Sequence, residues 1–80
     1  MRIEMTLRAS MQLENIDGEL KRWVMGCIDV LAAGKELPAE PMRTMPNTFF
    51  AKFNDYRLIF KREGDVIQVQ DILLLYKELC

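Results

Sequence analysis

Apolar and polar residues alternate along residues 49–60, and this pattern predicts a β-hairpin. The stretch reads FFAKFNDYRLIF, and the two residues at its centre, Asn54 and Asp55, tolerate the positive φ of a two-residue turn. Because successive side chains of a strand point to opposite faces, one face of the hairpin is apolar and should belong to the core. This core face comprises Phe49, Ala51, Phe53, Tyr56, Leu58 and Phe60. The register pairs Phe53 with Tyr56, Lys52 with Arg57, Ala51 with Leu58, Phe50 with Ile59 and Phe49 with Phe60.

The other face of the hairpin should place Lys52 directly across from Arg57. Like charges in this position destabilise a strand pair by roughly 0.2–1 kcal/mol. Two interpretations are open. An anion such as a phosphate could bind beside the two cations, or both side chains could extend into water and repel each other weakly.

The N-terminal pattern also has a period of two. Residues 3–13 alternate between apolar odd positions and polar even positions, which is typical of a half-buried strand. We predict a strand over about residues 2–8. Leu7 and Met11 could also lie on a short helix, so residues 9–15 stay open between strand and helix.

The next apolar residues recur every three or four positions and predict an amphipathic helix. Asp17 is placed to cap its N-terminus, and Gly34 is a candidate for its C-cap. Trp23 lies within the apolar stripe, so we interpret it as a core residue and not as a platform for stacking. The stripe consists of Leu20, Trp23, Val24, Cys27, Ile28 and Leu31.

The chain after this helix is interrupted by prolines. Residues 35–46 contain all three prolines of the sequence and cannot form a helix interior or a central strand. Beyond the hairpin, a turn at residues 63–65 leads into a strand over residues 66–71. Residues 72–79 read ILLLYKEL, which predicts the end of a strand followed by a short docking helix.

Together these elements predict one α+β domain over residues 1–80. Its centre is a mainly antiparallel, four-stranded sheet that joins the N-terminal strand to the C-terminal β-meander, with one or two helices packed on one face. The N-terminal strand should join this sheet because three strands alone would leave its apolar side chains without a partner.

Composition limits the possible functions. The formal net charge of −1 argues against non-specific binding to nucleic acid, so any such role must come from a local cluster of charge. The sequence lacks histidine and has no cysteine pair at ligand spacing, so we expect no zinc site and no other metal or cofactor. Cys27 and Cys80 are better explained as thiols than as a disulfide, and we find no signal peptide or membrane helix. We therefore expect a cytoplasmic protein.

The ordered set of motifs resembles the RelE/ParE superfamily of bacterial toxin–antitoxin toxins. The resemblance covers about residues 17–71: the helix text GCIDVLAAG, then MRTMPNTFFAKFNDYRLIFKREGDVIQV after a short loop. The most specific part is YRLIF, at residues 56–60, running into GDVI at residues 64–67. The resemblance implies a RelE-like fold, with helices on one side of an antiparallel sheet and a basic face on the other.

For function, the resemblance implies metal-independent cleavage of mRNA in the ribosomal A site, by attack of a 2′-hydroxyl on its own phosphate. Lys52 is similar to a strand lysine that acts as general base or phosphate contact. Arg57 is similar to the arginine that stabilises the charged transition state. Tyr76 would match a C-terminal catalytic tyrosine, and Arg43 and Lys61 would bind the RNA backbone.

The sequence also departs from the family pattern. The first strand lysine of the family falls at Phe50, and the arginine-rich segment after the last strand is replaced by residues 72–75, ILLL. Removing such cationic groups should slow cleavage by orders of magnitude, since each is worth about 2.7–4 kcal/mol.

Three hypotheses therefore stay open. The chain could be a ribonuclease with a weakened site. It could be a non-enzymatic interaction domain on the same fold, either one that binds DNA gyrase as ParE does or a relative that has lost cleavage. It could also be an unrelated α+β domain. An antitoxin is the expected partner, with the ribosome and its mRNA or gyrase as targets. The apolar residues 72–76 exceed what one small helix can bury, so an antitoxin or a second copy of the chain should cover part of them.

Overall fold

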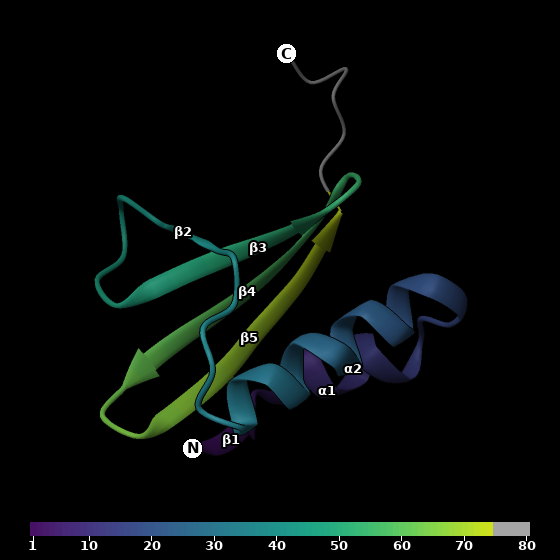
Figure 1. Ribbon diagram of the computed structural model, residues 1–80. Helices are drawn as coiled ribbons and strands as arrows, with labels where there is room; N and C mark the ends of the chain where they lie inside the picture. Colours follow the sequence, from purple (N-terminus) through teal and green to yellow (C-terminus); the bar gives the residue numbers. More distant parts are fainter. Residues whose placement is uncertain (75–80) are drawn as a thin grey trace.

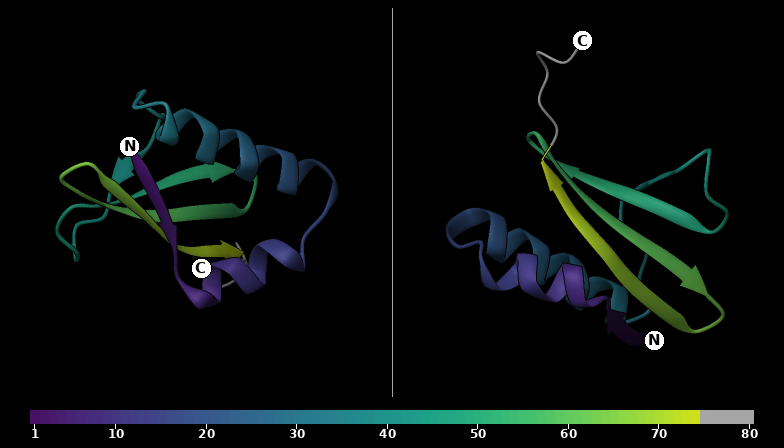
Figure 2. Two further views of the ribbon diagram at one scale, coloured as in Figure 1. Left: turned by 90° about the horizontal axis from the view of Figure 1, so that it is seen from below. Right: turned by 180° about the vertical axis from the view of Figure 1, so that it is seen from behind.

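A computed structural model of the chain describes residues 1–74 and has two layers, a sheet and a pair of helices (Figure 1). The further views show both helices on the same face of the sheet (Figure 2). Within the described residues, neither helix combines the length and the apolar character that crossing a membrane requires. The elements in chain order are β1 (Arg2–Met5), α1 (Leu7–Glu14), α2 (Gly18–Ala32), β2 (Glu40–Pro41), β3 (Thr48–Phe53), β4 (Tyr56–Glu63) and β5 (Val66–Leu74).

The strands form one sheet in the order β1-β5-β4-β3-β2. β1 runs parallel to β5, and the other neighbouring strands are antiparallel. The N-terminal strand does join the meander, as predicted. However, the prediction of four strands is wrong, because β2 adds a fifth strand at the edge. An edge strand tolerates Pro41, since a missing N–H on the outer side interrupts no ladder.

The hairpin of β3 and β4 confirms the predicted register at each position, including Lys52 opposite Arg57. Asn54 has a φ of 53°, the left-handed conformation that the tight turn requires. Three residues of the predicted core face are almost fully buried: Ala51, Leu58 and Phe60.

The predicted stripe of α2 packs on the sheet. Val24, Cys27 and Leu31 are its buried residues. The Trp23 ring stacks on the Phe53 ring at a centroid distance of 5.2 Å, which confirms Trp23 as a core residue. Burial raises the pKa of the Cys27 thiol to about 11, so this thiol stays protonated at neutral pH.

The two ends of α2 differ from each other. Asp17 occupies the N-cap position, but its side chain makes no capping hydrogen bond, so this part of the prediction is wrong. Gly34 lies just after the C-cap with a φ of 76°. Its N–H donates to the carbonyl of Leu31, and the N–H of Lys35 donates to the carbonyl of Val30. These two bonds form a Schellman motif, for which glycine is the preferred residue.

The strand predicted over residues 2–8 is too long. α1 begins at Leu7, and the stretch that the sequence left open is helical up to Glu14. Thr6 causes the change: its Oγ1 accepts a hydrogen bond from the N–H of Ala9 at 3.1 Å and caps the helix.

β5 extends to Leu74, beyond its predicted end at Asp71. Ile72 is buried, and Leu73 is half-buried on the other face of the sheet. The apolar run continues to Leu74 because β5 contributes apolar side chains to both faces of the sheet. The docking helix predicted beyond it, over residues 75–79, lies outside the described residues.

Candidate functional site

Lys52 on β3 and Arg57 on β4 are cross-strand partners, and their neighbours Ala51 and Leu58 are buried on the opposite face. The helices cover one side of the sheet only (Figure 1), so Lys52 and Arg57 belong to the face that carries no helix. They border a hollow of about 470 Å³ whose other side chains are apolar. The hollow is lined by Met42, Phe50, Lys52, Arg57, Ile59 and Leu73. The structure thus places two cations side by side on an apolar surface.

A carboxylate from the edge of the sheet accompanies the two cations. The Nζ of Lys52 lies 2.8 Å from Oε2 of Glu40, and Glu40 is the cross-strand partner of Phe50. The hydrogen bond from Lys52 and the positive charge of the same lysine hold the pKa of Glu40 below its ordinary value, and the charge of Arg57 acts in the same direction. Glu40 is therefore ionised at neutral pH. Its negative charge lies beside Lys52 and compensates the two cations, a role for which the sequence suggested a bound anion.

The Arg57 guanidinium bends back over the turn of its own hairpin. Its Nη1 donates to the backbone carbonyl of Tyr56 at 3.0 Å and to that of Asn54 at 3.3 Å. Among the described residues, its Nη2 and Nε find no hydrogen-bond partner. The backbone thus fixes the orientation of the guanidinium, and the remaining donors are available to an anion.

The other predicted site residues do not line this hollow. Arg43 is exposed in the loop between β2 and β3. The Nζ of Lys61 forms a salt bridge of 3.5 Å with Glu63, further along β4. Tyr76 lies outside the described residues. The structure therefore brings together Lys52 and Arg57 alone among the predicted residues that it describes.

Glu40 is the site residue that the sequence reasoning missed. It lies in residues 35–46, whose prolines exclude a helix interior and a central strand, and its position beside Lys52 depends on the pairing of β2 with β3. Its signal in the sequence was a single acidic residue before Pro41, which by itself indicates nothing about the hairpin. Within residues 1–74, no group of three or more His, Cys, Asp or Glu side chains is arranged to hold a metal ion.

No protein-family model matches the chain, and no curated protein matches it significantly in sequence. Solved structures do match. A chain of the intact E. coli RelBE toxin–antitoxin complex is similar with a TM-score of 0.77 and 17% identity, over 95% of this chain and 98% of that chain. The isolated E. coli RelE toxin gives a TM-score of 0.76 and 16% identity, over 95% of this chain and 85% of that one.

An archaeal structure agrees with these two. The RelB–RelE antitoxin–toxin complex from Methanococcus jannaschii gives a TM-score of 0.77 and 13% identity, over 89% of this chain and 88% of that one. At such identities the likeness concerns the fold. It nevertheless spans nearly the whole chain and agrees with the resemblance noted in the sequence. This chain therefore has the fold of the RelE toxins.

Proposed function

We propose that this chain is the toxin component of a toxin–antitoxin pair and that it cleaves mRNA on the ribosome, in the cytoplasm, without a metal ion. The observation that carries the proposal is the pair of Lys52 and Arg57 on the helix-free face of a RelE-like sheet. Two of the similar structures are complexes of a toxin with its antitoxin, which supports an antitoxin as the partner.

In the proposed reaction the two cations bind the scissile phosphate. The 2′-oxygen gives up its proton and attacks phosphorus, the bond to the 5′-oxygen breaks, and the leaving oxygen takes up a proton from water, so the products are a 2′,3′-cyclic phosphate and a 5′-hydroxyl. The free donors of Arg57 stabilise the negative charge that develops on the phosphate oxygens. Lys52 contacts the same phosphate; in the alternative role that the resemblance implies, it acts as the general base for the proton of the 2′-hydroxyl.

Lys52 must first exchange Glu40 for the phosphate. Both side chains of this ion pair are more than half exposed, at 52% and 56%, so water screens their attraction and the pair is weak. A phosphodiester that also contacts Arg57 offers the lysine a second favourable partner. The exchange is therefore feasible without any rearrangement of the sheet.

The remaining assignments rest on the resemblance alone. Arg43 and Lys61 would bind the RNA backbone, and Tyr76 would act at the cleaved phosphate. Phe50 stands where the family carries a further lysine, so we expect slower cleavage than by a toxin with the full set. Loss of one cation at such a site costs about 2.7–4 kcal/mol of transition-state stabilisation.

Induced expression in E. coli tests the proposal. The unmodified chain should arrest growth and produce cuts in mRNA that is bound to ribosomes. Arg57→Ala and Lys52→Ala should each reduce cleavage by about 100-fold or more, because each removes one charge from the transition state. Arg22→Ala is the matched control, since Arg22 is exposed on α2, on the other side of the sheet. Growth arrest and cleavage that persist in both site variants would contradict the ribonuclease proposal.

The apolar lining of the hollow favours a second candidate, a toxin-like domain that binds a protein such as DNA gyrase. Four of the six lining residues are apolar, and Lys52 is already paired with Glu40. In this case toxicity should survive Arg57→Ala and should be lost with Leu73→Asp, which places a charge in the apolar contact. The opposite pattern supports the ribonuclease.

A separate apolar surface offers a place for the antitoxin or for a second copy of the chain. We call it the α1 strip. Its most exposed members are Leu7, at 77%, and Met11, at 54%. Exposed leucine and methionine on one helix face, next to the end of β5, are typical of a surface that a partner covers. The strip consists of Leu7, Met11, Ile16, Tyr56, Ile72 and Leu74.

A further inference from the structure

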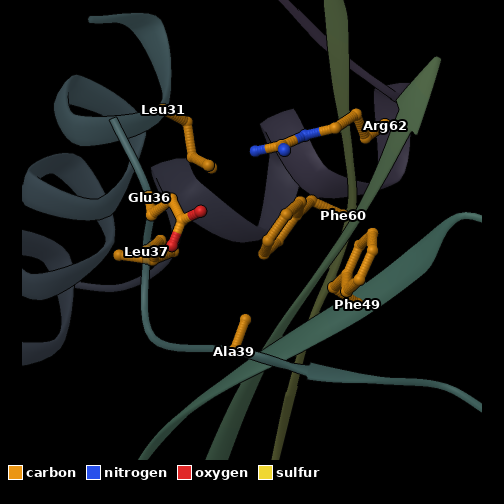
Figure 3. A pocket seen from close by; sticks show the side chains of 7 residues that line it. All are labelled: Leu31, Glu36, Leu37, Ala39, Phe49, Phe60 and Arg62. Atoms are coloured by element: carbon orange, nitrogen blue, oxygen red, sulfur yellow. The ribbon is translucent and has the colours of Figure 1, made fainter. Parts of the chain in front are cut away.

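A second pocket lies on the helix-bearing face of the sheet, away from Lys52 and Arg57 (Figure 3). It has a volume of about 170 Å³ and lies between the C-terminal end of α2, the segment that follows α2, and strands β3 and β4. We call it the aromatic pocket. It is lined by Leu31, Glu36, Leu37, Ala39, Phe49, Phe60 and Arg62.

The inner wall of the aromatic pocket is apolar. The rings of Phe49 and Phe60 stack at a centroid distance of 5.8 Å with an interplanar angle of 26°. Leu31 and Phe60 belong to the core and are only 1% and 3% exposed. The outer wall is made by Leu37 and by Ala39, whose short side chain leaves the space unfilled. Apolar cavities of about 150 Å³ admit a benzene ring, so this pocket has room for one aromatic ring or one branched aliphatic group.

Two opposite charges stand at the mouth of the pocket. Figure 3 shows the Glu36 carboxylate and the Arg62 guanidinium pointing into the space above Phe60, from opposite sides. Among the described residues neither side chain takes part in a hydrogen bond or a salt bridge. The pocket thus combines an apolar interior with one unpaired cation and one unpaired anion.

We propose that the aromatic pocket binds a free hydrophobic amino acid, with an aromatic or branched side chain. The side chain enters the pocket, the α-carboxylate faces Arg62, and the α-ammonium faces Glu36. A free amino acid carries both charges on neighbouring atoms of one small molecule, as the pocket mouth requires. A residue within a peptide has uncharged amides at those positions, so it offers each charged group only a neutral hydrogen-bond partner, which binds more weakly than an opposite charge. The site is independent of RNA cleavage, because it lies on the other face of the sheet.

Titration of the isotope-labelled chain with L-phenylalanine, followed by NMR, tests the proposal. We expect saturable shifts confined to the pocket, with the methyl groups of Leu31, Leu37 and Ala39 as reporters. Phenylethylamine lacks the carboxylate and should bind at least about tenfold more weakly, because a charge-assisted hydrogen bond is lost. N-acetyl-phenylalanine amide lacks both charges and should bind more weakly still.

Variants identify the groups responsible. Arg62→Gln and Glu36→Gln should each weaken binding of L-phenylalanine at least about tenfold. Ala39→Leu should abolish it by filling the space. Arg22→Gln and Glu19→Gln are the matched controls, since both residues are exposed on α2 outside the pocket. These controls should leave binding unchanged.

Three results would overturn the proposal. The first is the absence of saturable shifts with both L-phenylalanine and L-leucine. The second is equal binding by the wild type, Arg62→Gln and Glu36→Gln, whose amide spectra show that they are folded. The third is binding of N-acetyl-phenylalanine amide as tight as that of L-phenylalanine, since the pocket would then accept a side chain of a peptide.

Discussion

Lys52 reaches the Glu40 carboxylate across the edge of the sheet, and this contact determines how the lysine is available to a ligand. Glu40 lies on β2 and Arg57 on β4, on opposite sides of β3, so Lys52 stands between the carboxylate and the guanidinium. The carboxylate is the anionic partner of Lys52 in the structure. The same contact explains how β3 and β4 can carry a lysine opposite an arginine without a large loss of stability.

The titration of Glu40 reports on this contact. Its pKa lies below the ordinary carboxyl value because Lys52 stabilises the charged form. The ion pair thus contributes to stability above the ordinary carboxyl pKa, and the contribution is lost as the pH falls through the lowered value. We expect Lys52→Met to raise the pKa of Glu40 towards the ordinary value, as measured by carboxyl NMR. Lys61→Met, which removes a lysine paired with Glu63, should leave it unchanged. An unchanged Glu40 pKa in Lys52→Met would show that the contact is not formed in solution.

At the scale of the elements, α1 completes the edge of β5. β1 pairs with β5 only as far as Val69, and side chains of the following helix take over from there. The Oγ1 of Thr6 donates to the carbonyl of Gln70 at 3.0 Å. The Oε1 of Gln12 accepts from the N–H of Ile72 at 2.9 Å, and its Nε2 donates to Asp71 at 2.7 Å. Polar side chains thus satisfy strand groups that would otherwise be open to pairing with another chain.

Removing this edge contact should destabilise the fold. Gln12→Leu leaves the N–H of Ile72 without its partner and should lower the free energy of unfolding by about 1–3 kcal/mol. Urea denaturation measures the change. Glu14→Leu is the control, because Glu14 lies on the exposed side of the same helix, and it should change stability by less than about 0.5 kcal/mol. If Gln12→Leu also lowers the free energy of unfolding by less than about 0.5 kcal/mol, then water replaces the glutamine as the partner of the Ile72 N–H.

These contacts also explain which elements the sequence could predict. The register of the hairpin is a local property, set by alternation and a two-residue turn, and it was predicted in full. The helix α1 was not predicted in full, because its sequence continues the apolar–polar alternation of β1. Its Leu7 and Met11 also face outward. Its start depends on Thr6, which bonds to a strand more than 60 residues away. β2 was missed for the same reason: its two residues are a strand only through pairing with β3.

The candidate site was predictable to the same extent. The adjacency of Lys52 and Arg57 follows from the hairpin alone. The position of Glu40 does not, and neither does the placement of Glu36 and Arg62 at one pocket, because both depend on where the segment after α2 returns to the sheet.

At the scale of the whole molecule, three surfaces are separate from one another: the Lys52–Arg57 hollow, the aromatic pocket and the α1 strip. The first lies on the open face of the sheet and the second beneath the end of α2. The third follows α1 and the end of β5. A protein partner could therefore cover the strip while the other two sites stay accessible.

Light scattering and dye binding test whether the strip is covered. Without an antitoxin, the purified chain should self-associate or bind a hydrophobic dye through the strip. Exchange of Leu7 and Met11 for lysine should suppress both effects with little loss of stability, since both side chains are mostly exposed. Arg2→Lys with Glu14→Lys is a control outside the strip. A monomeric wild type that binds no dye would refute the idea of a covered strip.

The parallel pairing of β1 with β5 has a consequence for biosynthesis. Arg2 pairs with Val66, so β1, which is synthesised first, gains its partner strand only when β5 has been made. Until β5 has been made, the nascent chain lacks the strand that lies between β1 and β4 in the sheet. The sheet therefore cannot be completed before β5 has been synthesised.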